Sequence, residues 1–267
     1  SRRRQTRSPL GSRGLGDVYK RQPPGRAEFA ELAKDLATQV AVQKIRVVLN
    51  TAVDEKVLED EMPGAVILAT GAKPITPPIP GVELAHVVQS WDVLLNRVAT
   101  GRRAVVIGGG AVGVETALFL GEKGTLSGEA VKFLLVNKAE TPEDLYELAT
   151  QGTKDVVLIE MIKKIGKDIG LTTRWGMLQD MSRVGVKTNV STKALEITPT
   201  GVTVEMDGQT ETIPADTVVL AVGSESYNPL QEVMENKDIP YQVVGDAQGV
   251  ALAFDAVHNG FAAGRNI

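Results

Sequence analysis

The chain contains no cysteine among its 267 residues. These residues therefore supply no disulfide, no thiolate nucleophile and no cysteine-ligated zinc or iron–sulfur site. The absence of cysteine also fits a reducing compartment, so we expect a cytoplasmic protein. The two histidines, His86 and His258, lie far apart in the sequence, which disfavours a histidine-rich metal site. We expect no bound metal.

Aromatic residues and long apolar runs are also scarce. Only 4% of the residues are aromatic, whereas 43% are hydrophobic, chiefly Val, Ile, Leu and Ala. Such a composition is typical of an α/β protein with one large or two small domains. No apolar run approaches the roughly 20 residues that a membrane-spanning helix needs. We therefore expect no membrane partner.

The first 22 residues differ in charge from the rest. They carry seven Lys or Arg side chains and a single acid, Asp17. A basic arm for nucleic acid and a targeting peptide are two interpretations, but the apolar region of a signal peptide is missing. Residues 12–22 resemble a translated sequencing adapter, so we interpret segment 1–22 as non-native and disordered. The remaining residues hold 22 basic and 32 acidic side chains, a net charge of −10 that argues against nucleic acid as a partner.

A glycine loop follows a short apolar strand in the middle of the chain. The β-branched residues 105–107 predict a buried parallel strand, and residues 114–120 are compatible with a helix. Between them, Gly108, Gly110 and Gly113 fit the pattern G-x-G-x-x-G. Gly108 would allow the tight turn, Gly110 the approach of a pyrophosphate, and Gly113 the close packing of helix on strand. N–H groups at the helix start would then bind phosphates.

Strand and helix on either side make this motif a predicted dinucleotide site rather than an unliganded glycine turn. The candidate residues of the loop are Gly108, Gly109, Gly110, Ala111, Val112 and Gly113. An acidic residue at the end of the second strand normally follows such a loop by about 20 residues. Here the next apolar strand, 156–159, ends in Glu160, and a predicted helical insertion at about 125–152 precedes it.

The cofactor preference depends on Glu160. Its carboxylate would bind the ribose hydroxyls of NAD(H) and repel the 2′-phosphate of NADP(H), so we favour NADH. Lys163 and Lys164 follow closely and could attract that phosphate instead, which leaves NADPH as the alternative.

Local patterns predict further elements outside the loop. Residues 65–71 and 217–223 are similar apolar strands that each end at a glycine, which suggests two related domains. We also expect an amphipathic helix at 26–42, a short strand at 45–49, helices capped by Ser90, Ser127 and Thr141, and a hairpin at Asp207-Gly208.

The order of these motifs resembles a known group. ATGAKPITPPIPG, VVIGGGAVGVETALFL, VVLAVG and VVGDAQG are similar to motifs of flavin reductases with two dinucleotide-binding domains. PPGRAEF, EKGTLSGEAVKFLLVNKAETPEDL and IEMIKKIGKDIGLTTRW more closely resemble the C-terminal part of 2-enoate and 2,4-dienoyl-CoA reductases, of the NADH:flavin oxidoreductase, old-yellow-enzyme-like family. The resemblance covers residues 23–267. It implies a complete protein with an FMN-binding barrel, a [4Fe–4S] cluster and an FAD domain interrupted by an NAD(P)H domain.

The resemblance implies roles for particular residues. In this group the FAD phosphate loop precedes the strand that ends at Ala69, Thr70 and Gly71, so the glycine loop of this chain matches the nicotinamide site. The implied remainder of the FAD site is that strand end together with Gly245 and Asp246, whose carboxylate would bond the flavin ribityl chain. No second G-x-G-x-x-G precedes residue 65, so we expect this FAD site to be incomplete.

Three more residues are candidates for cofactor binding. Glu115 matches an acidic position near the nicotinamide in the wider group, and an ordinary exposed helix residue is the alternative. Val222 and Gly223 end the second of the two similar strands.

The expected fold is α/β, with a Rossmann-like domain inserted in a truncated, related FAD-binding domain. We place the NAD(H)-binding domain at 99–225 and the partial FAD-binding domain at 23–98 and 226–267. The resemblance implies electron flow from NADH through FAD, cluster and FMN to an activated C=C bond, with the missing barrel of the same polypeptide as partner. Alone, the chain should reduce no enoyl substrate. Alternatives are another pyridine nucleotide flavin reductase, such as a disulfide reductase, or a non-catalytic nucleotide-binding module.

Overall fold

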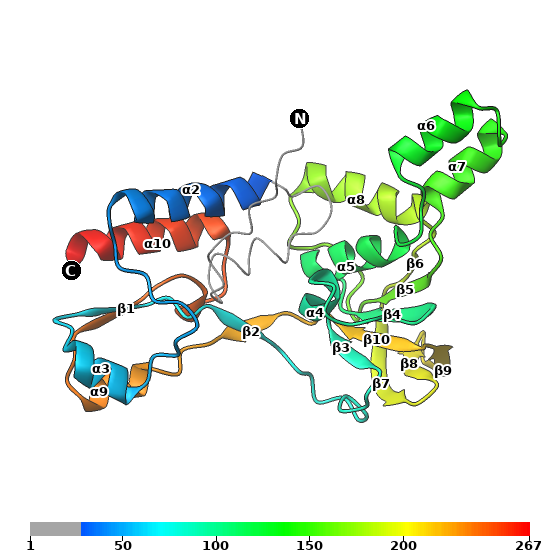
Figure 1. Ribbon diagram of the computed structural model, residues 1–267. Coiled ribbons are helices and arrows are strands. Elements are labelled where there is room, and N and C mark those ends of the chain that lie inside the picture. Colours follow the sequence, from blue (N-terminus) through cyan, green and yellow to red (C-terminus); the bar gives the residue numbers. More distant parts are fainter. Residues whose placement is uncertain (1–27) are drawn as a thin grey trace. The chain divides into compact units, whose positions relative to one another are not determined.

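The computed structural model describes residues 28–267, which divide into two units (Figure 1). The central unit is Pro74–Gly223, and the terminal unit consists of the described residues on either side of it. The predictions for segment 1–22 and for the first residues of the amphipathic helix lie outside the described residues. Among helices within 28–267, none has the length and apolarity that crossing a bilayer requires.

A five-stranded parallel sheet forms the middle of the central unit. Its strands, in spatial order, are β3 (Val87–Gln89), β10 (Thr217–Leu220), β4 (Arg103–Ile107), β5 (Asp155–Ile159) and β6 (Lys187–Asn189). The carboxyl ends of β10, β4 and β5 lie beside one another, since Leu220 is in register with Ile107, and Ile107 with Ile159. Both faces of these strands are covered, which explains their unbroken apolar runs.

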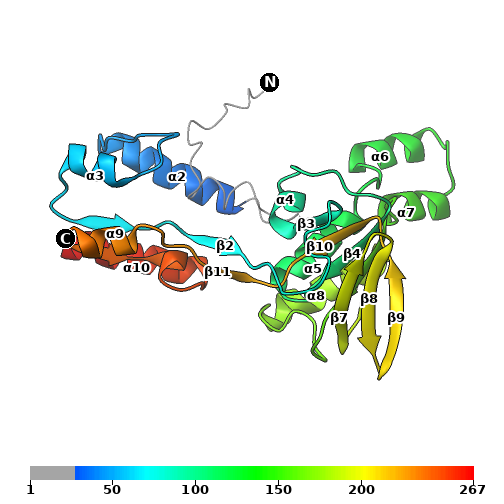
Figure 2. The ribbon, with the colours of Figure 1, turned by 90° about the horizontal axis from the view of Figure 1, so that it is seen from below.

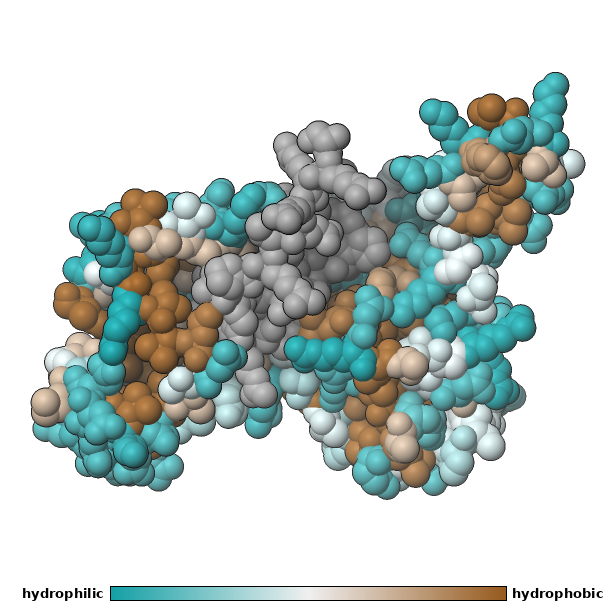
Figure 3. Space-filling view, viewed as in Figure 1, coloured by the Kyte–Doolittle hydropathy of each residue, from teal (hydrophilic) through white to brown (hydrophobic). Residues whose placement is uncertain are grey.

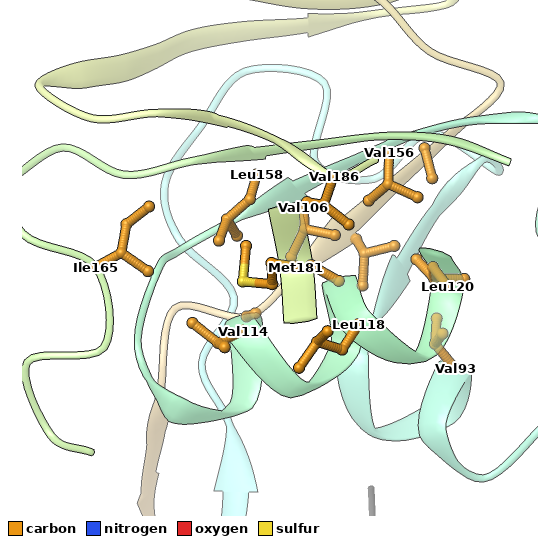
Figure 4. Close-up of a cluster of buried hydrophobic side chains, with 14 residues drawn as sticks. Val93, Val106, Val114, Leu118, Leu120, Val156, Leu158, Ile165, Met181 and Val186 are labelled. Atoms are coloured by element: carbon orange, nitrogen blue, oxygen red, sulfur yellow. The ribbon is translucent and has the colours of Figure 1, made fainter. Parts of the chain in front are cut away.

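Helices cover one face of the sheet. Val106 and Leu158 point from this face toward α5 (Ala111–Gly121), α8 (Leu171–Arg183) and α4 (Ser90–Leu94). Figure 4 shows Val114 and Leu118 of α5 against them, with Met181 of α8 alongside. Because this packing fixes the start of α5 against the end of β4, it positions the glycine loop.

An antiparallel sheet covers the other face. Its strands are β7 (Thr192–Thr198), β8 (Gly201–Met206) and β9 (Gln209–Pro214), visible beside the parallel sheet in Figure 2. Val105 and Ile107 of β4, alternating with the residues that face the helices, pack against Val202 and Val204 of β8. The predicted hairpin at Asp207-Gly208 is confirmed, since Met206 pairs with Gln209.

The insertion between α5 and β5 is a pair of helices, α6 (Gly128–Val136) and α7 (Pro142–Thr150). Ser127 and Thr141 are the N-caps, as predicted, and each side chain accepts a backbone N–H from the first turn. Apolar side chains remain exposed on this pair, including Phe133 at 66% and Val136 at 71%. Figure 3 shows such apolar residues at the upper right.

The terminal unit has a smaller core. Its elements are α2 (Glu28–Val42), α3 (Glu55–Glu61), β1 (Val66–Leu68), β2 (Ala72–Pro74, which ends in the central unit), β11 (Ser224–Ser226), α9 (Gln231–Asn236), β12 (Tyr241–Val243), η1 (Gly245–Ala247) and α10 (Ala253–Asn266). The parallel strands β1 and β12 pair with each other, and β2 pairs with β11. The buried residues of its hydrophobic core cluster are Leu58, Leu68 and Met234, and Val244, Ala247 and Ala263 are buried as well.

Four local expectations differ from the structure. Residues 45–49 form no strand, because they pair with no other described strand and Ile45, Val47 and Val48 stay exposed. In β1, expected to be buried, Ile67 is 39% exposed. Ser90 is the first residue of α4 rather than its cap. The central unit begins at Pro74 rather than at 99, because β3 pairs with β10 within its sheet.

Candidate functional site

The loop between β4 and α5 requires glycine at two positions. Gly108 has φ +108°, and a Cβ placed on it would lie 2.4 Å from the carbonyl oxygen of Ala221. A Cβ on Gly113 would lie 1.8 Å from the carbonyl oxygen of Gly108. The tight turn and the close packing expected at these positions are therefore present, whereas their role in binding a cofactor stays a prediction.

Gly110 is different, because the chain itself leaves room for a side chain there. It is the N-cap of α5 with φ −70° and ψ −176°, a backbone that any residue adopts. The nearest atom to a Cβ on Gly110 would be a carboxylate oxygen of Asp168 at 3.4 Å, an ordinary contact. Glycine is thus not needed for folding at this point. Its small size instead leaves space beside the helix N-terminus, which fits the approach of a pyrophosphate.

The structure brings Glu160 to the glycine loop. It follows β5, and its Oε2 accepts the N–H of Gly109 at 2.6 Å while its Oε1 accepts the N–H of Ile162 at 2.9 Å. A Cβ on Gly109 would lie only 2.9 Å from the Cβ of Glu160, so residue 109 must be small for the acid to lie here. The long insertion therefore does not displace the acid from the position predicted for it.

Asp168 is a second acid at the loop, and sequence reasoning missed it. Both of its carboxylate oxygens accept the N–H of Ala111, each at 3.0 Å. The neighbouring Gly166 donates its N–H to the carbonyl oxygen of Gly109 at 2.6 Å. The available signal was topological: loops after adjacent parallel strands leave the same edge of a sheet, so an acid in one can face the other.

The other nicotinamide-site candidates lie on two elements. Val222 follows β10, and its backbone nitrogen would lie 3.2 Å from a Cβ on Gly108, so it lies against the loop. Gly223 has φ +105°, and its carbonyl oxygen accepts the N–H of Ile75 at 3.1 Å. Glu115 is half-buried in the second turn of α5, and Val112 is half-buried in the first.

The FAD candidates gather at the carboxyl ends of β1 and β12 in the terminal unit. Ala69 and Gly71 follow β1, and the hydroxyl of Thr70 between them donates to the carbonyl oxygen of Tyr227 at 2.5 Å. Gly245 begins η1 after β12 with φ +59°. Since β1 and β12 are parallel and paired, these two strand ends lie side by side.

Asp246 and Thr70 are the polar side chains of this second group. Asp246 is half-buried, and its Oδ1 accepts the N–H of Ala251 at 3.2 Å, whereas no residue of the described range 28–267 donates to its other oxygen. Among residues 28–267, the terminal unit contains no G-x-G-x-x-G loop between a strand and a helix that could hold the FAD phosphates. The described residues therefore fit an FAD site in part.

Charge around the glycine loop has both signs. Glu160 and Asp168 contribute two carboxylates, while Lys163, Lys164 and Lys167 are exposed in the same segment between β5 and α8. Backbone N–H groups at the start of α5 add a partial positive charge. Within the described part of the chain, no group of three His, Cys, Asp or Glu side chains could hold a metal ion.

Comparisons with known proteins agree with this architecture. Residues 8–249 match the protein family described as pyridine nucleotide-disulphide oxidoreductase. The chain is 43% identical over 243 residues to a metal reductase of Desulforamulus reducens, covering 90% of this chain and 36% of that protein. It is 32% identical over 244 residues to an NADH oxidase of Thermoanaerobacter brockii, covering 89% and 33%. The chain thus spans about a third of the length of these relatives.

A solved structure supports the fold. The structure of a 2-naphthoyl-CoA reductase superposes with a TM-score of 0.77 at 25% identity, covering 95% of this chain and 34% of that chain. The predicted fold class, a Rossmann-like α/β architecture of the flavoproteins with two dinucleotide-binding domains, is confirmed.

Proposed function

The chain belongs to the pyridine nucleotide-disulphide oxidoreductase family, and we propose that its central unit binds NADH at the β4–α5 loop. The observation that carries this proposal is the Glu160 carboxylate, whose Oε2 lies 2.6 Å from the backbone nitrogen of Gly109. A carboxylate at the end of the second strand is the group that bonds the ribose hydroxyls of NAD in this fold. The name of the NADH oxidase relative supports the same cofactor.

Each part of the loop would hold a different part of NADH. The N–H groups of Ala111 and Val112, at the N-terminus of α5, would bond the pyrophosphate. Glu160 would bond the adenosine ribose, and its charge would disfavour the 2′-phosphate of NADPH. Val222, which lies against Gly108, would line the nicotinamide half of the site together with Glu115.

In the complete protein, FAD would accept the hydride of NADH and pass electrons onward. The residues at the ends of β1 and β12, Thr70 and Asp246 among them, would hold the flavin. We propose that a [4Fe–4S] cluster and an FMN barrel of the same polypeptide then carry the electrons to an activated C=C bond. The motif order supports this, as does the name of the similar 2-naphthoyl-CoA reductase. The isolated chain should oxidise no NADH with cinnamate as acceptor.

The substitution Glu160→Gln tests the cofactor assignment. Wild-type protein should bind NADH at least tenfold more tightly than NADPH, and the variant should lose most of that ratio because the repelling charge is gone. Isothermal titration with each nucleotide measures both affinities. Lys187→Gln, at the exposed start of β6, is the control and should leave the ratio unchanged. No saturable binding of NADH by folded wild-type protein would refute the proposal.

The family description also fits a disulfide reductase whose redox cysteines lie outside these residues. Expression of the complete gene separates the two functions. NADH should first bleach the bound flavin. Reoxidation of that flavin by cinnamate, but not by a disulfide substrate, supports C=C reduction. The reverse pattern supports the disulfide reductase. A product that retains no flavin would be a nucleotide-binding module without turnover.

A further inference from the structure

The backbone N–H groups of Gly109 and Ala111, the two neighbours of Gly110, already donate to carboxylates of this chain. The N–H of Ala111 donates to both oxygens of Asp168, at 3.0 Å each, and the N–H of Gly109 donates to Glu160 at 2.6 Å. Such carboxylates are the side-chain counterparts of a phosphate at a helix N-terminus. In the structure, Asp168 therefore takes the place in which the proposed function puts the pyrophosphate.

Asp168 and a pyrophosphate cannot both bond Ala111. The N–H of Ala111 is already shared between the two oxygens of Asp168, and the two anions would repel each other at this distance. Glu160 does not raise the same conflict, because its carboxylate lies beside Gly109, where the proposed function puts the ribose, rather than at the start of α5. The competition is thus confined to Asp168.

The segment around Asp168 can release Ala111 without unfolding. Ile165 is buried in the core beside α5, and Gly166 bonds the carbonyl of Gly109, so the segment stays attached at these points. The side chain of Asp168 itself is exposed. Rotation about its own side-chain bonds would move the carboxylate into water, which is a small change made within nanoseconds.

We propose that Asp168 is an internal competitor of the dinucleotide: its carboxylate caps α5 in the free protein and must leave when NADH binds. This inference rests on the proposed NADH site and adds a determinant of its affinity. A protein whose binding-competent form is only partly populated binds its ligand more weakly in proportion to that fraction. Since a side-chain cap of a helix contributes about 1 kcal/mol, removal of this one should tighten NADH binding about fivefold.

The test compares Asp168→Ala and Asp168→Asn with wild-type protein. Isothermal titration gives the Kd for NADH, and thermal unfolding without nucleotide gives the stability of each free protein. We expect Asp168→Ala to bind NADH about fivefold more tightly while unfolding at a lower temperature, because the free α5 has lost its cap. Asp168→Asn keeps an oxygen that can accept from Ala111 but lacks the charge, so its gain in affinity should be smaller.

A matched control removes the same charge elsewhere. Asp207→Asn lies in the exposed turn between β8 and β9, where φ is +50° and asparagine is well tolerated. Its NADH affinity should equal that of the wild type. A salt series adds a second readout, since the difference between Asp168→Asn and wild type should shrink as ionic strength rises.

The outcomes separate this inference from the proposed function. Wild-type binding with unchanged or weaker binding by both Asp168 variants would overturn the competition and leave the NADH site standing. Failure of the wild type and of both variants to bind NADH would refute the site and the competition together. Tighter NADH binding together with lower thermal stability in Asp168→Ala, with neither change in Asp207→Asn, would support the competition. Loss of a residue with a purely structural role would lower both the affinity and the stability.

Discussion

Gly110 is a residue of the glycine loop at which the fold itself does not require glycine. Its backbone is extended, and a Cβ there would meet the carboxylate group of Asp168, no closer than 3.4 Å. Gly113, three residues later, has no such freedom, because its Cβ would lie 1.8 Å from a backbone oxygen. The two glycines of one motif therefore differ in what their loss should do.

Substitution Gly110→Ala should weaken NADH binding at least tenfold with little change in thermal stability, because the added methyl occupies the space proposed for the pyrophosphate. Gly113→Ala, in contrast, should destabilise the free protein by about 2 kcal/mol or more, since the backbone itself must move. Titration and thermal unfolding measure the two effects. Gly128→Ala, at an open position of α6, is the matched control. Undiminished affinity in Gly110→Ala would show that no pyrophosphate approaches there.

At the residue scale, the sequence predicted the site residues that belong to a motif, such as Glu160, but it did not predict Asp168. Glu160 could be placed, because the apolar run of residues 156–159 locates the end of β5 whatever the length of the insertion before it. Asp168 could not, since its contact with Ala111 joins positions 57 residues apart through a loop without periodicity. The proposed competition between Asp168 and the phosphate depends on this one hydrogen-bond partner of Ala111, which no sequence pattern indicates.

At the scale of elements, an ion pair joins the starts of β4 and β10. Hydrogen bonds from the guanidinium of Arg103, and then from its backbone N–H, lower the pKa of Asp216 to about 2. The backbone bond spans 2.8 Å, from the nitrogen of Arg103 to Oδ2 of Asp216. A carboxyl group whose pKa is lowered in the folded state stabilises that state above its ordinary value of 3.8, and loses this contribution as pH falls toward 2.

The substitution Arg103→Met should raise the pKa of Asp216 toward its ordinary value. The variant should therefore be less stable than the wild type at pH 7, by a modest amount because the pair is exposed, and the difference should vanish near pH 2. Urea unfolding at a series of pH values measures this. Arg102→Met, which removes the exposed pair with Asp155, is the control and should leave the pKa of Asp216 near 2. A stability difference that does not depend on pH would contradict the assignment.

Elements with strong local signals were predictable from the sequence. The caps Ser127 and Thr141 start helices because their side chains bond N–H groups within three residues, a wholly local interaction. Residues 45–49 have the composition of a strand but no described partner, and a strand exists only by pairing. The boundary at Pro74 was missed for the related reason that β3 is assigned by its distant partner β10.

At the scale of the whole chain, the two units differ in the size of their cores. The central unit has large apolar clusters on both faces of its sheet, whereas the terminal unit buries chiefly Leu58, Leu68 and Met234. Both tryptophans of the chain, Trp91 and Trp175, belong to the central unit. Tryptophan fluorescence therefore reports on the central unit, while far-ultraviolet circular dichroism reports on both.

We expect urea to unfold the chain in two steps, the terminal unit first, because the smaller core buries less apolar surface. Circular dichroism should show both steps and tryptophan fluorescence only the second. NADH at a hundred times its Kd should stabilise the second step by about 2.7 kcal/mol and leave the first unchanged. Leu58→Ala should shift the first step alone, and Leu158→Ala the second alone, since each removes a buried side chain from one core. Coincident transitions by the two probes, or a shift of the first step by NADH, would show that the units unfold together and that the nucleotide contacts both.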